Sequence, residues 1–439
     1  MRALLTDLYE LTMAAGYFAA GKTAERATFE LSIRRLPARR SYVLATGIEQ
    51  ALEYLLELRF DGEEIEYLRS LPALGRAPRD FFDYLASFRF TGDVWAAEEG
   101  TPLFAGEPIL RVTAPLVEAQ IPETYLLSTI TFQTLIATKA SRLVEAAGGR
   151  PIIEFGTRRA HTPEAGLLAA RAAYIGGCIG TSNVAAARRF HLPVYGTAAH
   201  SWILAFDSEP EAFHRLRELL GEQTVYLVDT YDVERGVENA AAVGGAFQGI
   251  RLDSGDLLAD SRAARGILDR AGFPQARILA SGDLDEARIA SLVAAGAAID
   301  SFGVGTALAT SADAPAMGSI YKLVEIERGG RVRGPAKLSP GKPSWPGVKQ
   351  VFRFPDRDVV GLSEETYTGA TPLLTRAIHQ GRRAGAAPPL AELRQRTGEK
   401  LAALPAAVRR LENPQSYPVV YSERLLALAG ADNSAAVMQ

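Results

Sequence analysis

Residues 249–257 read GIRLDSGDL, and residues 277–285 read RILASGDLD. Each stretch begins as a short apolar run, typical of a buried strand, and ends in a turn that carries serine, glycine and aspartate. The tetrapeptide SGDL recurs at 254–257 and at 281–284. The recurrence predicts two strands that end in turns of the same kind.

Five further stretches between residues 151 and 306 follow the same pattern. They are PIIEFGTRR (151–159), YIGGCIGTSN (174–183), HLPVYGTAAHS (191–201), TVYLVDTYD (224–232) and IDSFGVGT (299–306). Between several of these stretches the sequence is helical, as in TPEAGLLAARAAYIGG (162–177), where Thr162 is the expected N-cap. Seven strand–turn–helix units predict parallel strands, and their number favours a closed α/β barrel over a doubly wound sheet.

In an α/β barrel the reactive groups collect on the loops that follow the carboxyl ends of the strands. Polar side chains occupy these positions here: Arg158, Ser182, His200, Asp229, Arg251, Asp253, Asp283 and Thr306. No single turn is a specific motif, but seven successive strand ends would place their polar side chains on the same face of the barrel. The sequence therefore predicts a site at that end of the barrel.

The flanking segments predict two further parts. Residues 1–125 alternate between helical and strand-like patterns, with Thr6 as a candidate N-cap, and predict an N-terminal α/β domain. Residues 126–350 contain the barrel, and a long buried helix runs into it from Pro122 to Gly148. Residues 351–439 are expected to form a mainly helical C-terminal segment packed on the other two parts.

Composition narrows the class of protein. The chain has 439 residues, of which 47% are hydrophobic and 23% charged, and its net charge is −3, so no basic excess indicates nucleic acid. The longest uncharged run, 190–206, contains proline, glycine and histidine and is no membrane span. A single cysteine, Cys178, excludes a disulfide framework and a multi-cysteine zinc site. The beginning of the chain lacks a secretory pattern, and a cytoplasmic enzyme is expected.

Two glycine-containing turns are candidate phosphate sites, because free backbone N–H groups at a strand-to-helix turn bind anions. They are Gly303–Thr306 and Ser281–Asp283. Each alone is more simply a tight turn without ligand. Two adjacent turns on the last strands of a barrel favour phosphate.

The acidic residues at the strand ends allow two interpretations. Asp229, Asp253 and Asp256 could converge on Mg²⁺ carried in with a diphosphate. Helix capping explains Asp232 and Asp256 equally well, but it explains Asp229 less well, because this residue directly follows an apolar strand. Both interpretations remain open from the pattern alone.

One histidine and a group of lysines also stand out. His200 in YGTAAHSWI is either a structural histidine or a phosphoryl acceptor at a strand end.

Only seven basic residues are lysines, yet four lie between 322 and 349, around KLSPGKPSWPGVKQVFR (337–353). Lysine suits a mobile phosphate, whereas the alternative is a solvated loop.

Taken together, the segments resemble the nicotinate phosphoribosyltransferase family, in the right order from about residue 5 to 425. The resemblance is carried by TDLYELTMAAGYF (6–18), EFGTRRAHTPEAGLLAARAAYIGG (154–177), GTSNVAAA (180–187), YGTAAHSW (195–202), VDTYD (228–232), GIRLDSGDL and KLSPGKPSWPGVKQVFR. It implies the type II phosphoribosyltransferase fold, an irregular α/β barrel with an N-terminal α/β domain. It also implies a homodimer whose subunits share their active sites.

The resemblance implies a reaction as well. Nicotinate and 5-phosphoribosyl-1-diphosphate (PRPP) would give nicotinate mononucleotide and pyrophosphate in the salvage route to NAD. ATP would be a co-substrate that phosphorylates His200, and Mg²⁺ would be the cofactor, facing Asp229 and Asp253. Tyr9 of a neighbouring subunit and Phe155 would sandwich the pyridine ring, while Arg158 and Arg251 would hold its carboxylate.

The remaining roles concern phosphate and specificity. The resemblance implies phosphate contacts for Gly282, Asp283, Gly303, Gly305, Thr306, Lys139, Lys337, Lys342, Lys349 and Arg34. Ser182 would select the acid, because the related nicotinamide enzyme has an aspartate there, whose charge would repel nicotinate. The alternatives are a sibling that uses nicotinamide or quinolinate, and a catalytically silent phosphoribosyl-binding protein on the same barrel.

Overall fold

A computed structural model of the chain describes residues 3–334 and 345–429. Their contacts form two compact units. The first unit contains the chain up to Leu135, Ala316–Pro389 and the residues from Glu399 onward; the second contains Ile136–Pro315 and Leu390–Gly398. The boundary falls inside helix α6 (Glu123–Ala146). Residues 316–334 and 345–350, expected with the barrel, therefore belong to the first unit.

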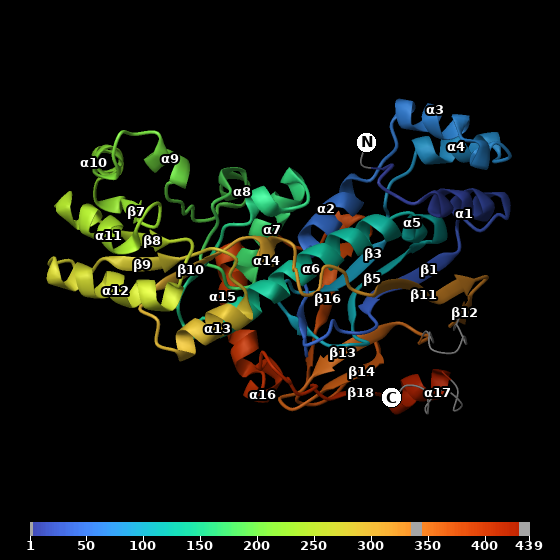
Figure 1. The fold of residues 1–439 in the computed structure, drawn as a ribbon. Helices are drawn as coiled ribbons and strands as arrows, with labels where there is room; N and C mark the ends of the chain where they lie inside the picture. The colour runs from blue at the N-terminus through green and yellow to red at the C-terminus, as the bar shows by residue number, and fades with distance from the viewer. Residues whose placement is uncertain (1–2, 335–344, 430–439) are drawn as a thin grey trace. The chain divides into compact units, whose positions relative to one another are not determined.

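The second unit is built on a parallel sheet of five strands in the order β6-β10-β9-β8-β7 (Figure 1). Their bounds are β6 Ile152–Glu154, β7 Val225–Leu227, β8 Gly249–Leu252, β9 Arg277–Ala280 and β10 Ser301–Val304. Beyond β6 the ladder continues as two parallel bridges, Glu154 to Thr181 and Thr181 to Val194. All seven predicted strand positions are therefore present, two of them only one bridge long, which confirms the irregular α/β barrel.

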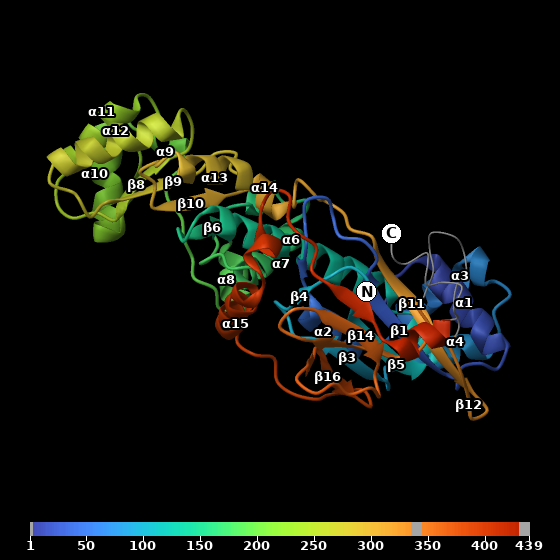
Figure 2. The same ribbon diagram turned by 90° about the horizontal axis from the view of Figure 1, so that it is seen from below.

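Helices follow the strands, and side-chain caps fix where several of them begin. Thr162 accepts from the Ala165 N–H at the start of α7, and Asp232 and Asp256 cap α11 and α12, as the capping interpretation predicts. The barrel helices are α7 Pro163–Ile175, α8 Val184–Phe190, α9 His200–Leu204, α10 Glu209–Leu220, α11 Val233–Ala242, α12 Leu257–Arg270, α13 Glu286–Ala294 and α14 Thr306–Ala309. In both views α11 and α12 lie next to each other (Figures 1 and 2).

The first unit contains a seven-stranded sheet in the order β12-β11-β1-β5-β3-β16-β17 (Figure 2). The strands are β1 Arg26–Ile33, β3 Asp93–Ala97, β5 Pro108–Pro115, β11 Ser319–Arg328, β12 Arg331–Arg333, β16 Leu374–His379 and β17 Arg382–Arg383. Phe29, Leu31 and Ile33 of β1 join a large apolar core with Leu110 and Val112 of β5. Most residues of β1 are buried, on both faces of the strand.

Short helices and a pair of two-residue strands complete the N-terminal part of this unit. They are α1 Leu8–Ala19, α2 Ile48–Glu57, α3 Gly62–Ser70, α4 Arg79–Ala86, α5 Leu116–Gln120, β2 Val43–Leu44 and β4 Pro102–Leu103. The N-cap of α1 is Asp7, not Thr6. The hydroxyl of Thr6 instead contacts the Glu10 carboxylate and the Ile121 carbonyl, which removes it from the helix end.

The expected helical segment 351–439 is wrong in its first half. Most of a second sheet, in the order β15-β13-β14-β18, and part of the large sheet lie there: β13 Lys349–Arg353, β14 Asp358–Leu362 and β15 Thr371–Pro372. The fourth strand of the second sheet, β18 Val419–Tyr421, lies near the end of the segment. Nearly all residues of β13 and all of β14 are buried, so their sequences lack the alternation that marks a half-exposed strand. The amphipathic stretch does form helices, α15 Leu390–Ala403 and α16 Ala406–Arg409, and α17 spans Glu423–Ala429.

Within the described ranges no helix is both long and apolar enough to cross a membrane.

Candidate active site

A histidine and two aspartates meet at the carboxyl ends of neighbouring barrel strands. Nε2 of His200, the first residue of α9, lies 3.2 Å from Oδ1 of Asp229, which follows β7. Oδ2 of Asp229 accepts the backbone N–H of Asp253 at 2.9 Å and the hydroxyl of Ser254 at 2.7 Å. The Asp229 side chain is only 2% exposed, whereas that of His200 is 39% exposed. The buried Asp229 carboxylate therefore holds one side of the His200 ring, and the rest of the ring is exposed to solvent.

Arg251 of β8 organises the neighbouring part of the site. Its guanidinium donates to Oδ1 of Asp253 at 2.7 Å, to the Ser281 hydroxyl at 2.8 Å and to the Thr197 hydroxyl at 2.9 Å. Ser281 also donates to Oδ1 of Asp253 at 2.5 Å. Burial alone would raise the pKa of Asp253, but the Ser281 hydrogen bond and the Arg251 charge outweigh it and hold that pKa below its usual value. Asp253 is therefore a persistent anion.

Phe155 lies directly after β6, and the backbone around it leaves room for its ring. The Cζ atom of Arg251 is 5.8 Å from the ring centroid, close enough for a cation–π contact. A Cβ on Gly303 would come within 2.4 Å of a ring carbon, so only glycine permits this placement of the ring. Phe155 also lines a cavity of about 90 Å³ with Tyr195 and Thr197. The structure thus brings the Phe155 ring and the Arg251 guanidinium together.

The two predicted phosphate turns lie at the ends of β9 and β10. Gly282 has φ of +92°, and a Cβ there would come within 1.8 Å of the Asp253 carbonyl, so this approach requires glycine. Asp283 follows with φ of +46°, which is uncommon for a residue with a side chain. After β10, Gly305 precedes the short helix α14, and Thr306 is exposed at its start.

Ser182 directly follows Thr181, the residue whose bridge to Glu154 extends the sheet beyond β6. Its N–H donates to the Glu154 carbonyl at 3.0 Å, and its residue is partly exposed. The buried Glu154 side chain accepts from the Thr181 hydroxyl at 2.5 Å and from the Gly156 N–H. Burial raises the pKa of Glu154, against the effect of these two hydrogen bonds. Glu154 thus holds the loops that carry Phe155 and Ser182 without itself facing the site.

The two aspartates expected at Mg²⁺ differ in what they can offer. Hydrogen bonds occupy both oxygens of Asp229, while within the described part of the chain those of Asp253 reach only Oδ1. The described residues contain no group of three or more acidic, histidine or cysteine side chains arranged for a metal. Mg²⁺ bound mainly through a diphosphate needs only one or two carboxylates. Oδ2 of Asp253 fits that requirement better than Asp229 does.

The two predicted lysines that the structure describes, Lys139 and Lys349, have internal partners for their ammonium groups. Lys139 is 2% exposed and pairs with Glu286 and, at 2.8 Å, with Asp313. Lys349 is 6% exposed and contacts Glu30 at 2.9 Å and the carbonyls of Trp345 and Gly347 at 2.8 Å. All three protons of its ammonium group therefore have internal acceptors. Lys337 and Lys342 lie outside the described residues.

The other predicted residues are divided between the units. Arg158 is exposed in the turn after Phe155, within the barrel unit. Tyr9, on α1, is 46% exposed and belongs to the first unit, as does Arg34 at the end of β1. Burial, and then the nearby charges of Glu123 and Glu10, raise the pKa of Tyr9, so its phenol stays protonated.

Sequence analysis placed Ser281 only in a candidate phosphate turn and gave Thr197 no role, although both contact Arg251. The recurrence of SGDL could have indicated a role for Ser281, because it places a serine after β9 as it does after β8. No pattern in the sequence indicated the contact of Thr197, because Thr197 and Arg251 are distant in sequence and meet only in the folded chain.

A barrel of this topology, with its anionic centre and glycine turns at the carboxyl ends of the strands, defines a phosphoribosyltransferase of type II. The family model for the quinolinate phosphoribosyl transferase C-terminal domain matches residues 136–314. The models for the nicotinate phosphoribosyltransferase N-terminal and C-terminal domains match residues 4–131 and 361–429.

Similar proteins identify the family. A nicotinate phosphoribosyltransferase of Mycobacterium tuberculosis is 45% identical over 97% of this chain and 92% of its own length. That of Bacillus subtilis is 40% identical over 96% and 93%. The crystal structure of human nicotinic acid phosphoribosyltransferase matches with a TM-score of 0.85 and 29% identity, over 98% of this chain and 100% of that one. The chain belongs to the nicotinate phosphoribosyltransferase family.

Proposed function

We propose that this chain joins nicotinate to PRPP, giving nicotinate mononucleotide and pyrophosphate, and couples the transfer to ATP hydrolysis through a phosphohistidine. It acts as a cytoplasmic homodimer in the salvage of nicotinate to NAD. The observation that carries the proposal is the hydrogen-bonded group His200–Asp229–Asp253–Arg251 at one end of the barrel. Family membership supports the substrates, since the flanking domains match the nicotinate enzymes.

The contact between His200 and Asp229 favours one nitrogen as the phosphoryl acceptor. A carboxylate oxygen can only accept, so Nε2 of His200 carries a proton toward Oδ1 of Asp229. The lone pair then resides on Nδ1, which attacks the γ-phosphorus of ATP as the bond to the ADP oxygen breaks. Asp229 also stabilises the positive imidazole that develops, the role of a carboxylate behind a catalytic histidine.

The transfer step uses the other residues. The bond between ribose C1 and the diphosphate oxygen breaks, and the pyridine nitrogen forms a new bond to C1. Asp253, kept anionic, stabilises the positive charge that develops on the ribosyl centre. Phe155 orients the pyridine ring by stacking, and Arg251 and Arg158 offer guanidinium groups to the nicotinate carboxylate. The turns at Gly282–Asp283 and Gly303–Thr306 offer N–H groups to the 5′-phosphate.

When bound, Mg²⁺ would neutralise the charge of the diphosphate leaving group, and Oδ2 of Asp253 is its proposed protein ligand. Asp229 is proposed to position His200 instead.

The direct test is product formation from nicotinate, nicotinamide and quinolinate, each with and without ATP. The proposal predicts the highest kcat/KM for nicotinate, stimulation by ATP and acid-labile label from γ-labelled ATP on His200. A nicotinamide or quinolinate preference would indicate the sibling enzyme, and absence of product with all three would indicate a silent binding protein. His200→Ala should abolish the label and the stimulation but retain slow transfer, because the proposed ring and ribose contacts lie elsewhere.

Sharing of sites between subunits has its own test. Tyr9 and Phe155 belong to different units of the chain, and the proposal places Tyr9 against the ring bound by the partner. Tyr9→Ala and Phe155→Ala proteins should each be nearly inactive. Mixing them after dissociation should restore part of the activity, because a mixed dimer has one site with both rings. No recovery in a verified mixed dimer would place both rings in the same subunit.

A further inference from the structure

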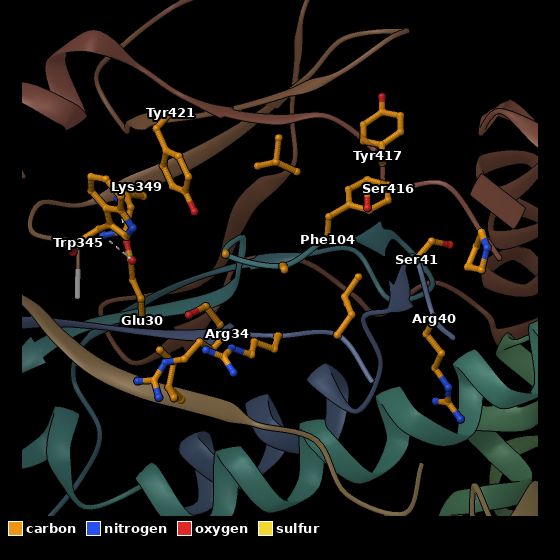
Figure 3. A pocket seen from close by; sticks show the side chains of 18 of the residues that line it. Glu30, Arg34, Arg40, Ser41, Phe104, Trp345, Lys349, Ser416, Tyr417 and Tyr421 are labelled. Carbon is orange, nitrogen blue, oxygen red and sulfur yellow. Dashed lines mark hydrogen bonds and ion pairs between the residues drawn. The ribbon is translucent and has the colours of Figure 1, made fainter. Parts of the chain in front are cut away.

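A buried lysine of the barrel unit contacts carboxylates from two different segments. The ammonium of Lys139 on α6 pairs with Glu286 and, at 2.8 Å, with Asp313. Lys349 of the first unit, by comparison, pairs with Glu30 of β1 on the wall of the pocket that Figure 3 shows. Because Lys139 is buried, its ammonium is directed to the two carboxylates and not to solvent.

A second cation of α6 completes this group of charges. Arg142, three residues after Lys139 and so about one helical turn along, lies 3.4 Å from the other oxygen of Glu286 and is also buried. Two cations of one helix thus face two carboxylates, and the formal charges cancel. Desolvation offsets much of the attraction in a buried ion pair, whereas loss of one partner leaves an unpaired charge. Such a group is therefore better suited to fix positions than to add stability.

Glu286 connects the group to the candidate phosphate turn after β9. It is the first residue of α13, and the side chain of Asp285 caps that helix. Asp283, with its positive φ, lies three residues before Glu286. The ion pair with Lys139 therefore holds the start of α13 and, with it, the end of this turn.

Asp313 connects the same group to the candidate phosphate turn after β10. Gly305 in that turn leads directly into α14, and Ser311 and Ala312 each donate a backbone N–H to a carbonyl of this short helix. Ser311 is buried with φ of +45°, and Asp313 follows two residues later. This compact path brings the Asp313 carboxylate to Lys139, so the ammonium lies between the continuations of both turns.

We propose that Lys139 is a positioning residue that fixes the spacing of the two phosphate turns without contacting the ligand. The turns are Gly282–Asp283 and Gly303–Thr306. The inference rests on the proposed function, in which N–H groups of both turns hold the 5′-phosphate of PRPP. One phosphate can accept from two turns only at a set separation, because N–H···O bonds require donor–acceptor distances of about 2.7–3.2 Å. This role replaces the direct phosphate contact that the sequence predicts for Lys139.

The test is calorimetric titration of the full-length protein with PRPP, ribose 5-phosphate and pyrophosphate in a buffer that contains Mg²⁺, together with steady-state kinetics. Asp313→Ala cuts the connection to the turn after β10. It should fold normally, because the Asp313 side chain is 37% exposed and Lys139 keeps Glu286. Asp313→Asn keeps an acceptor oxygen. Asp269→Ala removes the carboxylate of an exposed ion pair with Arg265 on α12 and is the matched control.

Asp313→Ala should weaken PRPP and ribose 5-phosphate at least fivefold and raise the KM for PRPP equally. Pyrophosphate affinity, kcat and the KM for nicotinate should stay within twofold, because the diphosphate and the pyridine are held elsewhere. Asp313→Asn should lie between Asp313→Ala and the wild type, and Asp269→Ala should match the wild type. Unchanged binding of ribose 5-phosphate by Asp313→Ala would overturn the positioning role.

Lys139→Met removes the ammonium itself and should weaken ribose 5-phosphate more than Asp313→Ala does, while again sparing pyrophosphate. Equal losses for ribose 5-phosphate and pyrophosphate would indicate direct contact with the diphosphate and overturn the inference. If Lys139→Met does not fold, the Asp313 variants decide alone. A wild-type protein that binds PRPP but forms no product with any pyridine would overturn only the proposed reaction, because ligand affinity still reports on the turns. Failure of the wild type to bind either PRPP or ribose 5-phosphate would overturn both.

Discussion

The backbone N–H of Asp253 donates to Oδ2 of Asp229 over 2.9 Å, so the carboxylate that faces His200 is fixed by the next strand of the barrel. The two oxygens of Asp229 have separate tasks. One holds the end of β8, and the other sets which nitrogen of His200 carries a proton. A substitution that changes only the second task can therefore isolate it.

Asp229→Asn should keep the fold but lose histidine phosphorylation. Its amide oxygen can still accept from Asp253 and Ser254, while its NH₂ group faces Nε2 and moves the imidazole proton to Nδ1. Because the wrong nitrogen then holds the lone pair, the labelling rate should fall by about 10²–10⁴, as tautomer reversal does in a catalytic triad. Asp232→Asn, at a helix N-cap that asparagine also satisfies, is the control. Unchanged labelling in Asp229→Asn would remove Asp229 from the activation of His200.

Ser182→Asp should discriminate against nicotinate. A carboxylate about 4 Å from the substrate carboxylate costs on the order of 4 kcal/mol at an effective dielectric constant of 20, or roughly a thousandfold in kcat/KM. Nicotinamide, which is neutral, should be affected far less. Ser182→Asn adds similar bulk without charge and should behave alike with both substrates. Equal losses for the two pyridines in Ser182→Asp would show that Ser182 does not select the acid.

Lys349→Met should destabilise the first unit more than it impairs phosphate binding. Removing one partner of a buried ion pair leaves Glu30 as an unpaired buried charge, at a cost of about 3–5 kcal/mol. Urea unfolding should show this loss, and adding Glu30→Gln should recover part of it. A wild-type unfolding free energy with a raised KM for PRPP would instead support the phosphate contact that the sequence predicts.

Glu10 should make stability depend on pH. The Thr6 hydroxyl contacts the Glu10 carboxyl and the Ile121 carbonyl, the latter at 3.0 Å. Burial, with nearby acidic charge and against the Thr124 hydrogen bonds, raises the pKa of Glu10 to about 8. The folded state therefore holds a proton that the unfolded state releases near pH 4.5. This stabilisation is complete below pH 4.5 and is lost as pH rises through 8.

The measurement is urea unfolding of the wild-type protein and of Glu10→Gln between pH 5 and 9. Glu10 should lower the wild-type unfolding free energy by up to ~1.4 kcal/mol per pH unit between pH 5 and 8. The Glu10→Gln variant should show a flatter profile, because its side-chain amide donates to Thr6 and accepts from Thr124 without titrating. Parallel profiles for the two proteins would place the pKa of Glu10 near its ordinary value.

The barrel was predictable because its signals are local. Each strand end, such as LDSGDL after GIR, combines an apolar run with a turn, and the order of these units fixes the parallel sheet. The capping roles of Asp232 and Asp256 were predictable for the same reason. The strands of 351–439 were not, because buried strands such as DVVGL carry no alternation.

The site was predictable in its residue types and less so in its contacts. Pattern alone brought His200, Asp229 and Asp253 to one end of the barrel, but it could not show that hydrogen bonds occupy both oxygens of Asp229. Nor could it show that Lys139 and Lys349 are buried in ion pairs, because their partners Glu286 and Glu30 are distant in sequence. Scarcity of lysine drew attention to them without revealing their surroundings.

The strand positions at Thr181 and Val194 are only one bridge long, so we expect the backbone there to open more readily than in β8 and β9. Backbone amides of β8 and β9 lie in a ladder of four residue pairs, whereas the segments at Ser182 and Tyr195 are held by shorter runs of backbone hydrogen bonds around one bridge each. Deuterium should therefore enter the second group faster than the first. If the pyridine and the sugar bind as proposed, the walls next to the pyridine can adjust during each turnover while the anionic residues under the sugar keep their positions.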